Sequence, residues 1–186
     1  MDSAYECITR HGLSGTTISE ICTKANVAKG TFYLYFNDKD DIARSLNRRI
    51  IQELIHDSYA EVLTNPRQEL VDNLLVMANY LIDRFERDHE LLKIIKHDFT
   101  WPISEGDLYN EKGQSIITGY LSIRSYSMQS HRPTSEVLSV IYCIVCMIIN
   151  VSYDTIIEHN PASMKTMRPV LNNIIETLIP RIADSF

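Results

Sequence analysis

The chain has 186 residues, of which 45% are hydrophobic and 23% are charged, which is the balance of a globular protein rather than a disordered one. Only 6 Gly and 6 Pro are present, which excludes collagen-like and linker-type chains and favours a mostly helical one. The net charge of −6 excludes a surface coated with basic side chains. Residues 1–50 nevertheless carry a net charge of +1 and the remainder −7, so we expect an anionic partner at the N-terminal part only.

Compartment and redox state follow from three further observations. The longest uninterrupted apolar run is the ten residues 140–149, shorter than the ~18 that a membrane span needs. The first residues lack the basic and apolar regions of a signal peptide. Four Cys in a chain of this size do not form a disulfide framework. We therefore expect a cytoplasmic protein with reduced thiols and no membrane partner.

The first 40 residues contain sequence signals of short helices. Gly12 suits the left-handed position that ends a first helix. Thr17-Ile18-Ser19-Glu20 fits a capping box and predicts a second helix of about two turns. Asn26 tolerates the positive φ of a tight turn, and Asn37-Asp38 offers the N-cap of a later helix. Three short helices are therefore predicted before residue 40.

Residues 17–36 have the pattern of a helix-turn-helix, in which two short helices are joined by a tight turn. The second helix would pack its inner side on the protein and insert its outer side into a DNA major groove ~12 Å wide. Gly30 would allow the duplex to approach the backbone closely. The predicted inner side is Val27, Phe32 and Phe36, and the predicted outer side is Lys29, Thr31, Tyr33 and Tyr35.

Longer amphipathic segments follow. Helices are predicted at about 38–63, 67–88, 90–98, 107–129, 135–158 and 162–183. Breaks are predicted at Asn65-Pro66, Trp101-Pro102, His131-Arg132-Pro133 and Asn160-Pro161, because a residue before proline leaves the α region. Pro169 fits the last helix only if that helix starts late, and Pro180 should kink or end it.

The run Lys29-Gly30-Thr31-Phe32-Tyr33-Leu34-Tyr35-Phe36, with Lys39 three residues further on, resembles the DNA-binding signature of the TetR family of bacterial transcriptional regulators. The resemblance covers roughly the first 46 residues. It implies an all-α protein with an N-terminal three-helix helix-turn-helix domain at 1–46. A C-terminal helical bundle at 47–186 would bind an effector and dimerise.

The resemblance also implies the DNA contacts, residue by residue. Lys29, Gly30, Thr31 and Tyr33 match family positions that reach base edges or nearby backbone. Thr17, Tyr35 and Lys39 match positions that touch phosphates, and Ser19 on the outer side of the second helix is a further candidate. The chain departs from the family pattern in three ways. It begins without the usual basic N-terminal arm, has Ala28 where a Ser commonly caps the recognition helix, and has Asn26 in place of the usual Gly.

The remaining chemistry-bearing residues indicate packing or a ligand pocket. Cys143-Ile144-Val145-Cys146 lies in the most apolar segment, so we interpret both thiols as core or dimer-interface packing rather than a metal or redox site. Cys7 and Cys22 are interpreted as core. The six His show no pairing at ligand spacing, and no catalytic cluster is found, so neither a metal, a cofactor nor an enzyme is predicted. Effector contacts are expected among Met77, Tyr80, Phe85, Phe99, Trp101, Tyr109, Tyr120 and Met128.

The sequence therefore predicts a ligand-responsive repressor that binds a palindromic operator as a homodimer. Its two-fold interface is expected to be a four-helix bundle of Ser135–Glu158 and Ala162–Ala183, whose apolar content exceeds the needs of one buried face. The residues that carry this expectation are Val137, Leu138, Ile141, Ile144, Val145, Ile148, Ile149, Leu171, Ile174, Ile175, Leu178 and Ile182. The alternative is a helical small-molecule-binding or redox-sensing protein with impaired DNA binding.

Overall fold

The computed structural model describes residues 1–67, 69–98 and 134–184, and within these ranges every regular element is a helix. The all-α prediction is confirmed. The helices are α1 (Asp2–Gly15), α2 (Ile18–Lys24), α3 (Lys29–Tyr33), α4 (Lys39–Thr64), α5 (Leu70–Arg87), α6 (His89–Asp98), α8 (Thr134–Ile156) and α9 (Met164–Asp184). The predicted helix at 107–129 and the predicted breaks at 101–102 and 131–133 lie outside the described residues.

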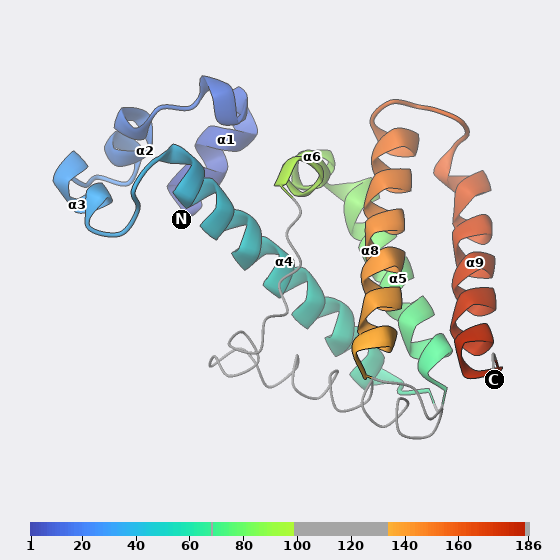
Figure 1. Cartoon of the computed structure of the whole chain (residues 1–186). Coiled ribbons are helices and arrows are strands. Elements are labelled where there is room, and N and C mark those ends of the chain that lie inside the picture. The colour runs from blue at the N-terminus through green and yellow to red at the C-terminus, as the bar shows by residue number, and fades with distance from the viewer. Residues whose placement is uncertain (68, 99–133, 185–186) are drawn as a thin grey trace.

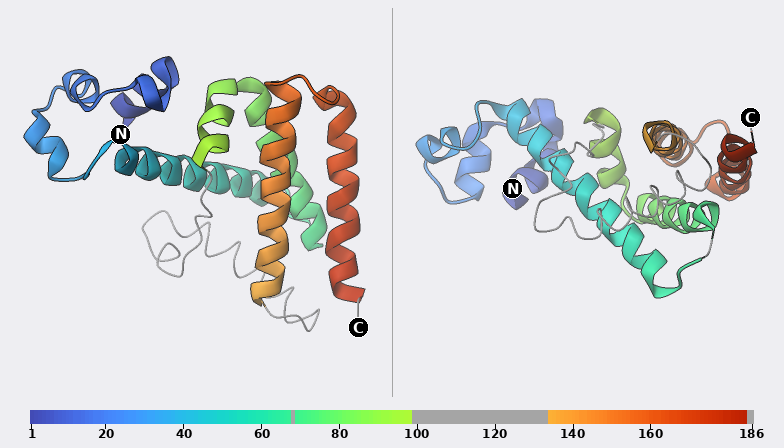
Figure 2. Two further views of the ribbon diagram at one scale, coloured as in Figure 1. Left: turned by 45° about the horizontal axis from the view of Figure 1, so that its top comes forward. Right: turned by 60° about the horizontal axis from the view of Figure 1, so that its bottom comes forward.

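The helices form a small head and a larger body joined by α4. Figure 1 shows α1, α2 and α3 gathered at one end of α4, and α5, α6, α8 and α9 gathered along its other part. In Figure 2, α8 and α9 run side by side in opposite directions. The head is therefore held at a distance from the outer helices of the body.

The head has its own small core and capped helices. Thr17 Oγ1 accepts a hydrogen bond from the Glu20 N–H at 3.2 Å, and Asp38 Oδ1 accepts one from the Asp41 N–H at 2.7 Å. Asn26 has a φ of +54°. The two predicted N-caps and the predicted positive-φ turn are thus confirmed. The buried cluster of the head consists of Ala4, Cys7, Ile21, Cys22, Phe32 and Ile42, with Ile18 and Phe36 packed against it.

As predicted, Gly12 takes a positive φ of +69° and ends the first helical stretch of α1, after which a further short helical stretch runs to Gly15. Two other expectations about the head need correction. The third helix ends at Tyr33, so Phe36 packs inward from beyond it. Val27 is 42% exposed and does not line the inner side. Its N–H bonds to the Cys22 carbonyl at 3.0 Å, which places Val27 in the turn that closes α2.

The body helices match the predicted segments closely. The helix α4 ends at Thr64, directly before Asn65-Pro66, and Asn160-Pro161 lies between α8 and α9. The helix α9 begins at Met164 and includes both Pro169 and Pro180. Pro169 therefore lies beyond its first turn and Pro180 does not end it, which corrects both expectations, whereas a kink at Pro180 stays a prediction. Pro169 removes the N–H that would bond to the Lys165 carbonyl, and the exposure of both residues lets water satisfy that oxygen.

Much of the apolar surface of α8 and α9 is used within the chain itself. The members of the predicted interface set that are buried in the core of the body are Val137, Ile141, Ile144, Ile148, Ile149, Leu171 and Ile175. These seven side chains are used by the core of the single chain, whereas the other members of the set are half-buried, exposed or not described, and the interface stays a prediction. The segment Glu136–Ile156 is long and apolar enough to cross a membrane by composition, a test that core helices also pass, and α8 packs against α5, α6 and α9.

The head and the body also touch each other beside α4. Ile8 of α1 belongs to the core of the body, with Tyr5 packed against it. Burial, together with the nearby Asp88 carboxylate, raises the pKa of Tyr5. Asn47 of α4 is 3% exposed and donates through Nδ2 to the Ile94 carbonyl of α6 at 3.4 Å. These contacts fix the direction in which the head faces.

Candidate nucleic-acid interface

The side chains of α3 divide into an inward and an outward set. Phe32 is 5% exposed and packs with Phe36 at a ring-centroid distance of 5.5 Å, and edge-on to Tyr33 at 5.4 Å. The outward set, with Tyr35 immediately beyond the helix, is exposed: Lys29, Gly30, Thr31, Tyr33 and Tyr35. The buried ring thus anchors the short helix, and a cation, a hydroxyl and two phenols face solvent.

Gly30 lies at the start of this surface with nothing packed over it. A Cβ added to Gly30 would meet no atom within 4 Å, and its φ is not positive. Neither crowding within the protein nor backbone conformation therefore requires glycine here. Ala28 occupies the N-cap without a side-chain hydrogen bond, so the first N–H groups of α3 are left without a side-chain cap.

Of the three predicted phosphate contacts, Tyr35 lies just beyond α3, and Thr17 and Lys39 lie at the starts of α2 and α4. Thr17 and Ser19 are exposed at the start of α2. The Thr17 hydroxyl accepts from Glu20 and keeps its own hydrogen for donation. Lys39 is half-buried at the start of α4, where its Nζ donates to the Ser14 carbonyl at 3.3 Å. An ammonium has two further donors for a phosphate.

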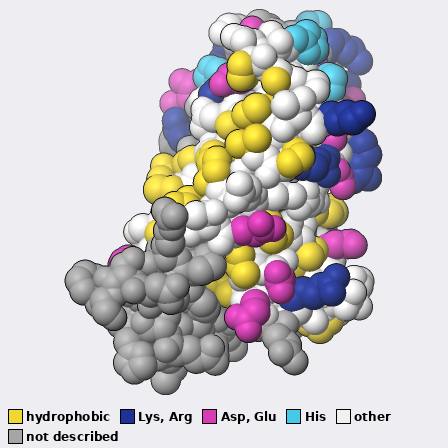
Figure 3. All heavy atoms as spheres, turned by 90° about the vertical axis from the view of Figure 1, so that its right-hand side faces the viewer, with side chains coloured by type: hydrophobic (Ala, Val, Ile, Leu, Met, Phe, Trp, Pro, Cys, Tyr) yellow, Lys and Arg dark blue, Asp and Glu magenta, His cyan; other side chains and the backbone are white. Residues whose placement is uncertain are grey.

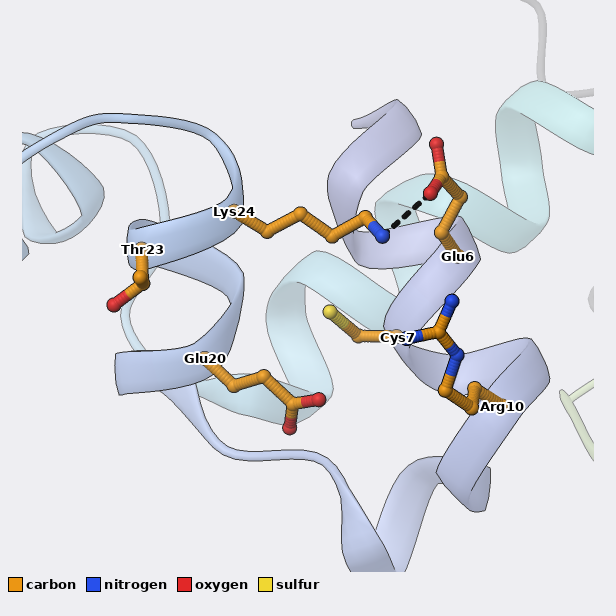
Figure 4. A pocket seen from close by; sticks show the side chains of 6 residues that line it. All are labelled: Glu6, Cys7, Arg10, Glu20, Thr23 and Lys24. Atoms are coloured by element: carbon orange, nitrogen blue, oxygen red, sulfur yellow. Dashed lines mark ion pairs between the residues drawn. The ribbon is translucent and has the colours of Figure 1, made fainter.

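Other charges of the head pair with one another. Lys24 Nζ lies 2.5 Å from Glu6 Oε2, and His11 Nε2 lies 3.1 Å from Glu20 Oε1. Figure 4 shows the pocket of about 380 Å³ between α1 and α2, lined by Glu6, Cys7, Arg10, Glu20, Thr23 and Lys24. Its walls carry charges of both signs, and burial raises the pKa of the Cys7 thiol. The pocket therefore presents neither a cationic anion site nor an activated nucleophile.

Sequence reasoning missed one exposed side chain of this surface. Leu34 is 80% exposed, directly after α3 and between two exposed tyrosines. It follows Thr31 by three residues and Gly30 by four, which places it on their face of a helix. That spacing can be read from the sequence. A leucine close to Phe32, however, is expected in the core if only its hydrophobic type is considered.

The predicted effector residues are only partly described. Phe85 of α5 is 1% exposed and belongs to the core of the body. Met77 and Tyr80 of the same helix are half-buried, and burial raises the pKa of Tyr80. The other members of the predicted set lie outside the described residues: Phe99, Trp101, Tyr109, Tyr120 and Met128.

The four thiols separate into two groups. Cys7 and Cys22 are each 3% exposed, which confirms their interpretation as core residues. Cys143 of α8 is exposed and Cys146 is half-buried. Core packing is therefore wrong for Cys143, whereas interface packing stays a prediction. Among the described residues, no group of His, Cys, Asp or Glu could hold a metal ion.

The fold and this surface define an all-α protein of the helix-turn-helix class. Residues 1–46 match the sequence model of "Bacterial regulatory proteins, tetR family", which confirms the resemblance carried by α3. The N-terminal part of the chain is thus similar in sequence to the DNA-binding domain of these regulators.

Curated relatives agree over parts of their length. The chain is 32% identical over 100 residues to the "Probable acrEF/envCD operon repressor" of Escherichia coli K12, a match that covers 52% of this chain and 45% of that protein. It is 27% identical over 123 residues to the "Fatty acid metabolism regulator protein" of Bacillus subtilis, covering 66% and 61%. The chain thus spans about half of the first relative and under two thirds of the second.

Solved structures share the fold over nearly the whole chain. The transcriptional regulator FadR from Bacillus subtilis, in complex with stearoyl-CoA, is 19% identical, with a TM-score of 0.62 and 96% of both chains covered. A TetR-family regulator from Syntrophomonas wolfei is 18% identical, with a TM-score of 0.64 and coverage of 95% and 91%. At this identity the likeness establishes the architecture.

Proposed function

We propose that this chain is a ligand-responsive transcriptional regulator in the cytoplasm, a repressor that binds a palindromic DNA operator as a homodimer. Residues 1–46 are the DNA-binding domain and residues 47–186 the effector-binding and dimerisation domain. It acts by binding rather than by catalysis, in keeping with the regulators to which it is related.

The observation that carries this proposal is the outward surface of α3. Lys29, Thr31 and Tyr33 are held outward by the buried ring of Phe32, at a helix whose Gly30 is open to solvent. Cationic and hydroxyl side chains on a short exposed helix can form hydrogen bonds and ion pairs with base edges and phosphates. Of these, Lys29, Gly30, Thr31 and Tyr33 would approach the bases. Thr17, Tyr35 and Lys39 would contact phosphates, and Ser19 is a further candidate for a DNA contact.

A homodimer is supported by the apolar side chains that α8 and α9 leave outside their own core. Val170 and Leu178 of α9 are 46% and 40% exposed, and Tyr142 and Cys143 of α8 are also exposed. Figure 3 looks onto the side of the molecule where α9 lies, and apolar side chains form a band along this face. Pairing of α8 and α9 across a two-fold axis would bury that band. It would present the two α3 helices together to half-sites ~34–36 Å apart.

The effector is proposed to bind between the body helices, with the half-buried Met77 and Tyr80 among its contacts. Since a neighbouring structure holds stearoyl-CoA and one relative is a fatty acid metabolism regulator, a long-chain acyl-CoA is the first ligand to test. A ligand present at ~100 times its Kd adds ~2.7 kcal/mol to the free energy of unfolding. Stearoyl-CoA should therefore raise Tm and release DNA, whereas free CoA should do neither.

The DNA-binding proposal is tested by selecting duplexes from a random library with the full chain and footprinting the enriched sequence. A palindrome with half-sites one helical turn apart is expected. Thr31→Ala or Lys29→Ala should change the preferred bases, because these residues approach base edges. Equal losses on the selected site and on random DNA would contradict base reading, and a library without any enriched sequence would contradict the proposal itself.

A further inference from the structure

Leu34 is the most exposed of the large apolar side chains found exposed on the described part of the chain, at 80%. Its position is fixed rather than loose, because its backbone stays in the right-handed helical region and its N–H bonds to the Thr31 carbonyl at 3.3 Å. Leaving a leucine in water forgoes the free energy of burial. An ordered, exposed leucine on this candidate interface is therefore available to contact a binding partner.

The helical geometry assigns Leu34 to the base-reading face. It lies three residues after Thr31 and four after Gly30, the spacings that place side chains on one side of a helix. Gly30 has no side chain to hold a ligand away, and the side chain of Phe32 is directed into the core. A duplex that approaches Gly30 and Thr31 would meet Leu34 next.

The surroundings of Leu34 favour DNA over a protein partner. Its neighbours Tyr33 and Tyr35 are 57% and 75% exposed, and their hydroxyls suit phosphates or base edges. Protein interfaces bury contiguous apolar patches, whereas this surface has one leucine between two phenols. In the major groove the apolar groups are isolated methyls, and each belongs to a thymine C5.

We propose that Leu34 contacts the C5-methyl group of a thymine in each half-site and thereby makes thymine preferred at that position. This inference rests on the proposed function, since it requires that α3 enters the major groove. Leu34 is then a specificity-determining residue beside Thr31. It supplies apolar recognition where the rest of the surface supplies hydrogen bonds and charge.

The test compares thymine with uracil, which differ by this methyl group alone. A site is first selected with the wild-type chain, and each of its thymines is then replaced by uracil in turn. Affinity is measured for the wild type, Leu34→Ala and a matched control, Leu63→Ala. Leu63 is 55% exposed near the far end of α4. For the wild type and the control, uracil at one position per half-site should weaken binding roughly fourfold, the effect of one methyl group.

In Leu34→Ala the same replacement should cost nothing, and repeated selection should no longer enrich thymine there. The Tm of this variant should equal that of the wild type, because the side chain packs on little of the protein. Uracil effects that persist unchanged in Leu34→Ala would overturn the inference. An equal loss of affinity of Leu34→Ala for all DNA sequences would also overturn it, because it indicates contact with the sugar–phosphate backbone. If the wild type enriches no sequence, the regulator proposal fails first and this inference fails with it.

Discussion

The ammonium of Lys39 at the start of α4 donates a hydrogen bond to the Ser14 carbonyl near the end of α1, 3.3 Å away. The contact ties α1 to α4 and holds the amine near the N-terminal end of α4. If this amine also neutralises a phosphate, Lys39→Ala should weaken binding to all sequences. The slope of log K against log salt should flatten by about 0.9 per lost phosphate contact.

The conservative variant Lys39→Arg serves as the control and should keep most of the slope. Since Lys39 is only half-buried, its contact with Ser14 should add little to stability, and Tm should hardly move in either variant. A salt slope identical in wild type and Lys39→Ala, measured by titration of labelled duplex, would show that Lys39 acts within the protein alone.

Gly30→Ala should preserve the stability of the fold while weakening DNA binding. Nothing in the protein lies where the new methyl would go, and alanine is favoured over glycine in a helix by up to ~1 kcal/mol. Thermal unfolding should therefore occur at the same temperature or higher. DNA affinity should fall, because the methyl would stand between α3 and the duplex.

Gly12→Ala provides the contrast for this prediction. Gly12 has a φ of +69°, so alanine there should lower the free energy of unfolding by ~1 kcal/mol or more. Unimpaired DNA binding by Gly30→Ala would argue that the duplex does not approach this part of α3.

Val170→Glu and Leu178→Glu should convert the dimer into a monomer. Both side chains are partly exposed on α9, so a glutamate is tolerated in the single chain but would be buried without a partner in a two-fold interface. Leu63→Glu, on an exposed residue of α4, should leave the dimer intact. Light scattering or sedimentation gives the mass directly. A wild type that sediments as one chain at micromolar concentration would refute the interface.

Because of Cys7, the free energy of unfolding should decrease at alkaline pH. Burial raises the pKa of this thiol above its ordinary value of 9.0, so the folded state binds the proton more tightly than the unfolded state does. The stabilisation is fully present below pH 9.0 and is lost as pH rises towards the folded pKa. Tm should therefore fall more steeply above this pH in wild type than in Cys7→Ala. Parallel curves for the two proteins would contradict the prediction.

Helix boundaries were predictable where a local cause acts. Thr17 and Asp38 cap their helices through their own side chains, and Asn65-Pro66 stops α4 because proline restricts the residue before it. Burial was less predictable, because it depends on the neighbours that a side chain meets in three dimensions. Val27 is apolar but belongs to a turn that faces solvent. Pro169 lies in an exposed part of α9, as does Lys165, the residue whose carbonyl loses its donor.

The candidate site was predictable to the extent that its residues match a family pattern. Lys29, Thr31 and Tyr33 were expected outward and lie outward. Leu34 was overlooked because its hydrophobic type suggests burial, whereas in the fold this leucine is 80% exposed and packs on little of the protein. The contact of Lys39 with Ser14 was likewise out of reach, since it joins residues of two different helices.

The 26 residues of α4 give it a length of about 39 Å at 1.5 Å per residue. A rotation of about ten degrees at the end inside the body would therefore displace the other end by roughly 7 Å, about a sixth of the helix length. Two such displacements in a symmetric pair would add. A ligand that tilts the body end of α4 by this amount would move the paired heads away from the separation that one helical turn of DNA requires.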